Sequence, residues 1–127
     1  MKRKILLAFL ALLIIGYMTV TGFIKPTTIF VNDFEVSSDG KIMTIYVSNA
    51  GSAGYVRKVV QNKQDNKLLL DFYAAFGGFN GSIGAKNVYE LKLNDDIDTI
   101  SIYRGPNKYQ DVLVKDVKGN FIFLKNN

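Results

Sequence analysis

The chain divides into two parts by the spacing of its hydrophobic residues. Positions 5–24 hold no charged side chain, and they follow a basic tip at 1–4 and precede Lys25. At about 1.5 Å per residue, a helix of that length reaches roughly 30 Å, the thickness of a bilayer's hydrocarbon core. We therefore predict a transmembrane signal-anchor helix from Ile5 to Ile24, with the lipid bilayer as its partner.

The basic residues predict how this helix is oriented. Lys2, Arg3 and Lys4 outnumber Lys25, and the denser cluster of positive charge favours the cytoplasmic side of a membrane. The domain that follows is then expected outside the cell membrane. The alternative is a signal peptide cut near Gly22, which would release a secreted domain. Signal peptides usually have an apolar region of about 7 to 15 residues, so the longer run favours a retained anchor.

Beyond a short linker at 25–28, apolar residues recur at every second position, as in half-buried β-strands. In the first such segment, which begins at Ile29, we place Phe30, Phe34 and Val36 on the inner face. Later segments alternate more clearly, with inner faces formed by Met43, Ile45 and Val47, by Leu68, Leu70 and Phe72, by Tyr89, Leu91 and Leu93, and by Ile100 and Ile102. The segment at 68–73 is apolar on both faces, so we expect it near the centre of a sheet.

Turn-forming residues separate these segments about every ten positions. Asp39-Gly40 is typical of a tight hairpin, and polar turns are expected at 64–67 and 104–108. Eight short extended segments without an amphipathic helix predict a single all-β domain at 29–127, an antiparallel β-sandwich of the immunoglobulin-like kind. A small closed β-barrel, including an OB-like one, has the same sequence signature and stays open as an alternative.

The charge of the chain reflects its two parts. The formal net charge is +5, but Lys2, Arg3, Lys4 and Lys25 flank the apolar run. The remaining domain has twelve basic against eleven acidic residues, which leaves no polybasic stripe for nucleic acid. We therefore expect no nucleic-acid partner.

Several chemistries are excluded or disfavoured by residue type and spacing. The chain has no cysteine and no histidine, which rules out disulfides, thiolate chemistry and ordinary zinc sites. The glycine-rich stretch 76–85 lacks the Gly-Lys-Ser/Thr ending of a phosphate-binding loop, and we interpret it as a connection between sheets. The acidic turn at 95–98 lacks the glycine and glutamate spacing of a calcium loop. We expect no cofactor and no bound metal.

One part of the chain resembles a known group of proteins. The resemblance lies in Phe72-Tyr73, Phe76-Gly77-Gly78, the run from Ser82 to Asn87, Ile102 to Gly105 and Val112 to Asp116. These residues look like the outer domain of small exported or membrane-anchored proteins of Gram-positive bacteria. The resemblance implies a location on the outer face of the membrane.

The sequence favours a non-enzymatic binding module for a protein or a cell-wall partner. Tyrosine and arginine supply large contact areas at low entropic cost, and the candidate contact residues are Tyr55, Arg57, Tyr73, Tyr103, Arg104 and Tyr109. One alternative is an accessory subunit of a membrane transport or secretion complex. Another is a hydrolase that pairs Asp71 with Asp111 or Glu90, which would need two carboxylates at a defined separation.

Overall fold

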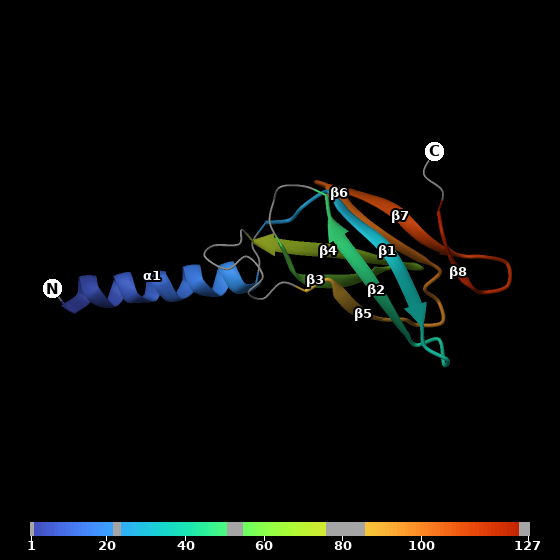
Figure 1. The fold of residues 1–127 in the computed structure, drawn as a ribbon, viewed down its shortest axis with the longest axis horizontal. Coiled ribbons are helices and arrows are strands. Elements are labelled where there is room, and N and C mark those ends of the chain that lie inside the picture. The colour runs from blue at the N-terminus through green and yellow to red at the C-terminus, as the bar shows by residue number, and fades with distance from the viewer. Residues whose placement is uncertain (1, 22–23, 51–54, 76–85, 125–127) are drawn as a thin grey trace.

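The computed structural model describes residues 2–21, 24–50, 55–75 and 86–124. Within them, a helix is followed by strands that hold more than half of the described residues (Figure 1). The elements are α1 (Lys2–Thr21), β1 (Ile29–Val36), β2 (Ile42–Asn49), β3 (Tyr55–Gln64), β4 (Lys67–Ala75), β5 (Val88–Lys92), β6 (Thr99–Gly105), β7 (Lys108–Lys115) and β8 (Phe121–Phe123).

The strands form two sheets. One has the order β1-β2-β5 and the other the order β3-β4-β6-β7-β8. Neighbouring strands are antiparallel except for β4 and β6, which run parallel, with Lys67–Leu70 opposite Thr99–Ile102. The two sheets pack with a shared hydrophobic core, and α1 extends away from them (Figure 1).

The core is built from the inward positions of both sheets. Its fully buried side chains include Ile29, Met43, Ile45, Leu70, Phe72, Leu91, Ile97, Ile100, Ile102 and Leu113. Removing such side chains from water stabilises a fold by roughly 1.5–3 kcal/mol each. This burial holds together a domain whose sequence has no cysteine for a disulfide.

The order of the strands corrects two parts of the predicted architecture. The two sheets do not close into a barrel, so the barrel alternative is wrong. The domain is also not wholly antiparallel. In an immunoglobulin-like domain the third strand lies beside the sixth, whereas here β4 lies beside β6 in parallel. The reason is that the chain passes through β5 of the opposite sheet before β6 returns beside β4.

Several predicted inner faces are confirmed. Met43, Ile45 and Val47 are buried on β2, as are Tyr89 and Leu91 on β5 and Leu93 just after it. β4 lies between β3 and β6, as its two apolar faces predicted. The hairpin turns also fall where expected, with Gly40 at φ 74°, Asp65 at 55° and Asn107 at 58°.

The predicted inner face of β1 is partly wrong. Ile29 is buried and Phe34 packs against the core, but Phe30, which pairs with Ser48, is 48% exposed. Val36 pairs with buried Met43 on the inner face and is 39% exposed at the end of the strand. The register shifts between Val31 and Asp33, where β1 has one residue more than its partner strand. Such a bulge reverses the alternation from that point on, which a period of two cannot anticipate.

The helix also differs from the predicted transmembrane segment. It ends at Thr21, and Ile24 already forms an antiparallel bridge with Ala74 of β4. Among the residues described, no helix combines the length and the apolar character needed to cross a membrane.

The glycine-rich stretch 76–85 and the proposed cleavage point at Gly22 lie outside the described residues.

Candidate binding surface

Three of the predicted contact residues meet on the outer face of the five-stranded sheet. Side chains alternate along a strand, so with Leu70 and Phe72 of β4 in the core, Asp71 and Tyr73 face outward. Tyr103 of β6 lies directly opposite Tyr109 of β7. We call Asp71, Tyr73, Tyr103 and Tyr109 the tyrosine surface.

Asp71 lies at the centre of this surface and is only 7% exposed. The Tyr109 hydroxyl donates a hydrogen bond of 2.7 Å to its Oδ1, and the Lys25 ammonium lies 3.3 Å from its Oδ2. A carboxylate that loses its water needs such partners, because an unpaired buried charge is costly. Tyr109 and Lys25 therefore each contact one carboxylate oxygen of Asp71 below the tyrosine rings.

The aromatic rings have specific arrangements. Tyr103 and Tyr109 pack edge to face with ring centroids 6.0 Å apart. The Lys25 ammonium lies 4.0 Å from the centroid of the Tyr103 ring, and Lys58 of β3 lies 5.0 Å from that of Tyr73. Ring faces attract cations through their quadrupole. The surface thus combines tyrosine rings, one carboxylate and two ammonium groups.

The tyrosine surface perturbs the titration of one of its own members. Partial burial raises the pKa of Tyr109 to about 12, and the hydrogen bond to Asp71 and the charge of that carboxylate act in the same direction. A phenolate beside Asp71 would place two negative charges together. Tyr109 is therefore a neutral hydrogen-bond donor at physiological pH.

Lys25 reaches this surface because the chain after the helix joins the sheet. The Ile24 amide donates to the Ala74 carbonyl at 2.9 Å, and the Ala74 amide donates to the Ile24 carbonyl at 2.7 Å. The pairing of β4 with β6 ends at Leu70 and Ile102, and the bridge at Ala74 lies further along β4. Lys25, next to Ile24, therefore reaches side chains of both strands. Sequence reasoning placed Lys25 in a linker, and no local pattern marks it as a member of the surface.

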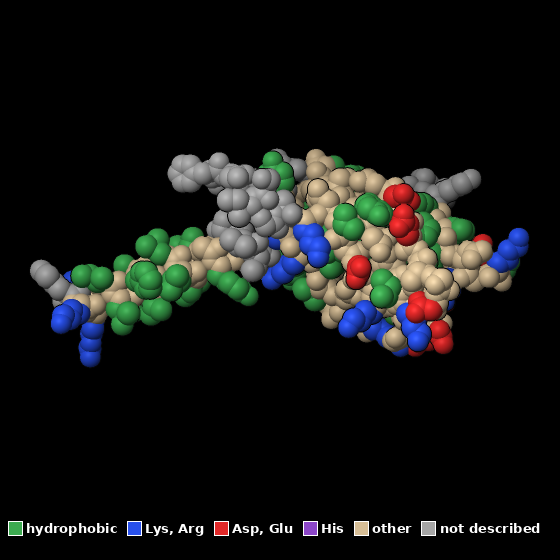
Figure 2. Space-filling model, turned by 60° about the horizontal axis from the view of Figure 1, so that its bottom comes forward, with side chains coloured by type: hydrophobic (Ala, Val, Ile, Leu, Met, Phe, Trp, Pro, Cys, Tyr) green, Lys and Arg blue, Asp and Glu red, His purple; other side chains and the backbone are tan. Residues whose placement is uncertain are grey.

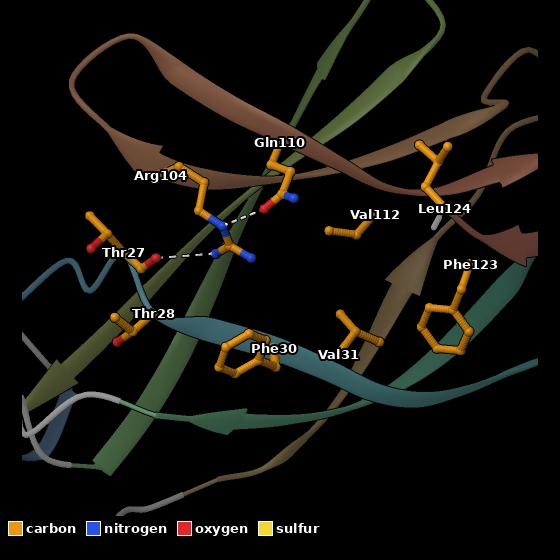
Figure 3. A pocket seen from close by; sticks show the side chains of 9 residues that line it. All are labelled: Thr27, Thr28, Phe30, Val31, Arg104, Gln110, Val112, Phe123 and Leu124. Atoms are coloured by element: carbon orange, nitrogen blue, oxygen red, sulfur yellow. Dashed lines mark hydrogen bonds between the residues drawn. The ribbon is translucent and has the colours of Figure 1, made fainter. Parts of the chain in front are cut away.

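Arg104 lies beside Tyr103 and lines a separate cavity of about 230 Å³ between the two sheets (Figure 3). Its Nε donates to Gln110 Oε1 at 2.8 Å. Its Nη1 lies 3.4 Å from the carbonyl oxygens of Thr27 and Tyr103. Burial lowers the pKa of the guanidinium from its usual value. Arg104 is therefore a positioned cation at the edge of the core.

The other two predicted contact residues lie elsewhere. Tyr55 is exposed at the start of β3, opposite Ala75. Arg57 lies at the position in β3 where the pairing with β4 shifts register, and its side chain is 7% exposed. With Lys86 and Tyr89 it lines a depression between the sheets. The structure therefore does not bring Tyr55 and Arg57 to the tyrosine surface.

The structure does not bring the carboxylates considered for hydrolysis together as a catalytic pair, and Asp71 and Asp111 make structural contacts. Asp111 accepts hydrogen bonds from Ser101 at 2.5 Å and from Lys67 at 3.1 Å, and the Ser101 bond is the main cause that lowers its pKa. Glu90 lies on β5, in the other sheet. In the acidic turn, Asp96 pairs with Lys63 and Asp98 accepts hydrogen bonds from Asn66 and Thr99. These hydrogen bonds and ion pairs connect neighbouring strands and turns.

The fold and the surface define a class: a mostly β domain of two packed sheets, with an apolar helix at its N-terminal side and a tyrosine-rich outer face. No protein-family model, no curated protein and no solved structure matches the chain.

Proposed function

We propose that the protein is a non-enzymatic binding module held at a membrane, and that the tyrosine surface contacts a protein or a cell-wall partner. The observation that carries the proposal is that Tyr109 bonds to Asp71 and packs against Tyr103, while Tyr73 lies on the same face of β4 as Asp71. Tyrosines are enriched at recognition surfaces because each buries a large area with few rotatable bonds. A β-sandwich is the arrangement that we propose for the two sheets that support this surface.

The hydrogen bonds and ion pair of Asp71 favour binding over catalysis. The Tyr109 hydroxyl contacts Oδ1 of Asp71 and the Lys25 ammonium contacts Oδ2, so this carboxylate positions its neighbours. The same contacts fix the positions of Tyr109 and Tyr103 before a partner arrives, because Lys25 touches both Asp71 and the Tyr103 ring. Preorganised side chains lose less entropy on binding.

The helix supports the membrane part of the proposal. Its large hydrophobic side chains from Ile5 to Tyr17 are exposed, and Figure 2 shows them along the helix, with lysine and arginine at its free end. A helix that is apolar around its whole circumference is not stable in water without a cover. Lipid supplies that cover, and the proposal requires burial in lipid without requiring that the helix crosses the bilayer.

Site-specific cross-linking tests the proposed contact surface. A photoreactive amino acid replaces Tyr109 in the full-length chain in cells, and a matched variant carries it at Val117, which is fully exposed in a turn. We expect a discrete cross-linked product from position 109 and none from position 117. Equal products from both positions, or none from position 109, would contradict the proposed surface.

Flotation with liposomes tests the role of the helix separately. The full-length chain is expected to float with vesicles, and the variant Leu10→Lys is expected to stay in the soluble fraction because a charge in the helix opposes burial in lipid. A circular dichroism spectrum with unchanged β content serves as the folding control. The side of the membrane stays a prediction from the basic residues at 2–4, and protease added to intact cells checks it.

A further inference from the structure

The cavity beside Arg104 has the features of a ligand site of its own. It lies between β1 in one sheet and β6 to β8 in the other, away from the tyrosine surface (Figure 3). We call it the Arg104 cavity, and its walls are Thr27, Thr28, Phe30, Val31, Arg104, Gln110, Val112, Phe123 and Leu124. Its volume of about 230 Å³ is below the roughly 300–1,000 Å³ of pockets for drug-sized ligands, so it suits one residue-sized group.

The positive charge in this cavity has no counterion among the described residues. Gln110 and two carbonyl oxygens hold Nε and Nη1 of Arg104, while Nη2 has no hydrogen bond to the part of the chain described. None of the described carboxylates forms an ion pair with Arg104. A partly buried guanidinium favours an anion, and its planar fork matches a carboxylate in particular.

The part of the wall away from Thr27, Thr28 and Gln110 is apolar and partly open. Phe30, Phe123 and Leu124 are 48%, 44% and 42% exposed, so this part of the wall is reached by solvent. Figure 3 shows Phe30, Val31 and Phe123 on the side of the cavity that faces Val112 and Leu124. At the far end, the rings of Phe34 and Phe123 meet edge to face with centroids 5.2 Å apart. The cavity is thus short, with a cation near one end and hydrophobic walls beyond it.

We propose that the Arg104 cavity binds the C-terminal residue of a peptide that ends in an apolar side chain. The carboxylate pairs with Arg104, and the side chain covers Phe30 and Phe123. The carbonyl group of Thr27 and the side-chain amide of Gln110 lie next to the guanidinium, where the last peptide amide would lie. A fatty acid has no amide to use these groups, which favours the peptide. The proposal stands independently of the tyrosine surface, because Arg104 lines a different side of β6 from Tyr103.

Nuclear magnetic resonance of the full-length chain, kept in solution with a mild detergent, tests the proposal. The probes are N-acetyl-Ala-Leu with a free carboxylate, the same peptide as an amide, and hexanoate. We expect the free acid to shift backbone amide signals of residues 27–31, 110–112 and 123–124, and the amide to need at least a tenfold higher concentration. Equal effects of acid and amide, or no shifts at these residues, would overturn the proposal. Hexanoate that binds as tightly as the acid peptide would assign the cavity to fatty acids and overturn the peptide proposal as well.

Variants link the preference for a carboxylate to Arg104. Arg104→Gln is expected to remove the tenfold preference, whereas Arg104→Lys keeps part of it because the positive charge remains. Lys118→Gln makes the same change of charge in a turn outside the cavity and should leave the preference unchanged. A preference that survives Arg104→Gln would overturn the proposed role of the guanidinium. If that variant does not fold, the comparison of acid and amide on the unchanged chain decides.

Discussion

The ammonium group of Lys25 lies 3.3 Å from the carboxylate of Asp71. This ion pair joins the segment after the helix to the outer face of the five-stranded sheet. The same ammonium lies over the Tyr103 ring, so one lysine contacts both β4 and β6 where they no longer pair with each other. The end of the helix and the proposed binding surface are thereby linked through a few side chains.

Replacing Lys25 tests the strength of this link. Lys25→Met should lower the free energy of unfolding by about 1 kcal/mol, since it leaves the Asp71 carboxylate with one partner fewer. The loss is smaller than for a fully buried pair because Lys25 keeps some exposure to water. Lys25→Arg retains a cation and should cost less. Urea denaturation of the full-length chain measures both, and equal stability of Lys25→Met and the unchanged chain would contradict the link.

The pKa of Tyr109 predicts how stability depends on alkaline pH. The pKa is about 10.0 in the unfolded chain and is raised to about 12 in the folded domain, so folding favours the protonated phenol. The stabilisation of the fold by the protonated Tyr109 phenol is fully present below pH 10 and is lost as the pH rises towards 12. Tyr109→Phe should therefore make stability fall less steeply between pH 10 and 12. Denaturation midpoints at several pH values measure this, with Tyr17→Phe in the helix as the matched control, and identical slopes would refute the assignment.

Leu70 tests the packing between the sheets. It is fully buried at the centre of β4, and Leu70→Ala should lower the free energy of unfolding by about 2–5 kcal/mol, because it removes buried surface and leaves a cavity. Val117→Ala removes an apolar side chain from a fully exposed turn and should change stability by less than about 0.5 kcal/mol. Chemical denaturation of both variants makes the comparison, and a loss below 1 kcal/mol for Leu70→Ala would contradict its place in the core.

Gly40 tests the turn between β1 and β2. Its φ of 74° lies in the left-handed region, and nothing lies within 4 Å of the position that a Cβ would take. The cost of Gly40→Ala therefore comes from backbone strain alone and should be about 1 kcal/mol. Gly40→Asn should cost less, because asparagine tolerates this conformation. Thermal unfolding ranks the variants, and an alanine variant as stable as glycine would show that the turn adopts another conformation.

The sequence predicted the inner faces of several strands correctly. In β2 and β5 every second residue is apolar, and the pleat of a strand puts these residues on one buried face. The same reasoning gave the wrong face for Phe30 in β1. An extra residue at a bulge is set by pairing with β2, and no residue type within β1 announces it.

The candidate contact residues also divide into what residue type predicts and what the fold decides. Tyr73, Tyr103, Arg104 and Tyr109 were selected by residue type. Their separation into a tyrosine surface and a cavity depends on which face of the sheet each occupies. Arg57 was selected on the same grounds but lies buried at an irregularity of β3. Residue type alone does not distinguish an outward tyrosine from an arginine that is tucked between sheets.

The strand segments, their turns and most of the core follow from the sequence, because hydrophobic alternation and turn preference are local properties of the chain. Tertiary structure alone decided that β4 pairs in parallel with β6, that Ile24 joins β4, and that Lys25 meets Asp71. These contacts join residues far apart in the chain. They depend on how whole sheets pack and pair, so no local pattern could specify them.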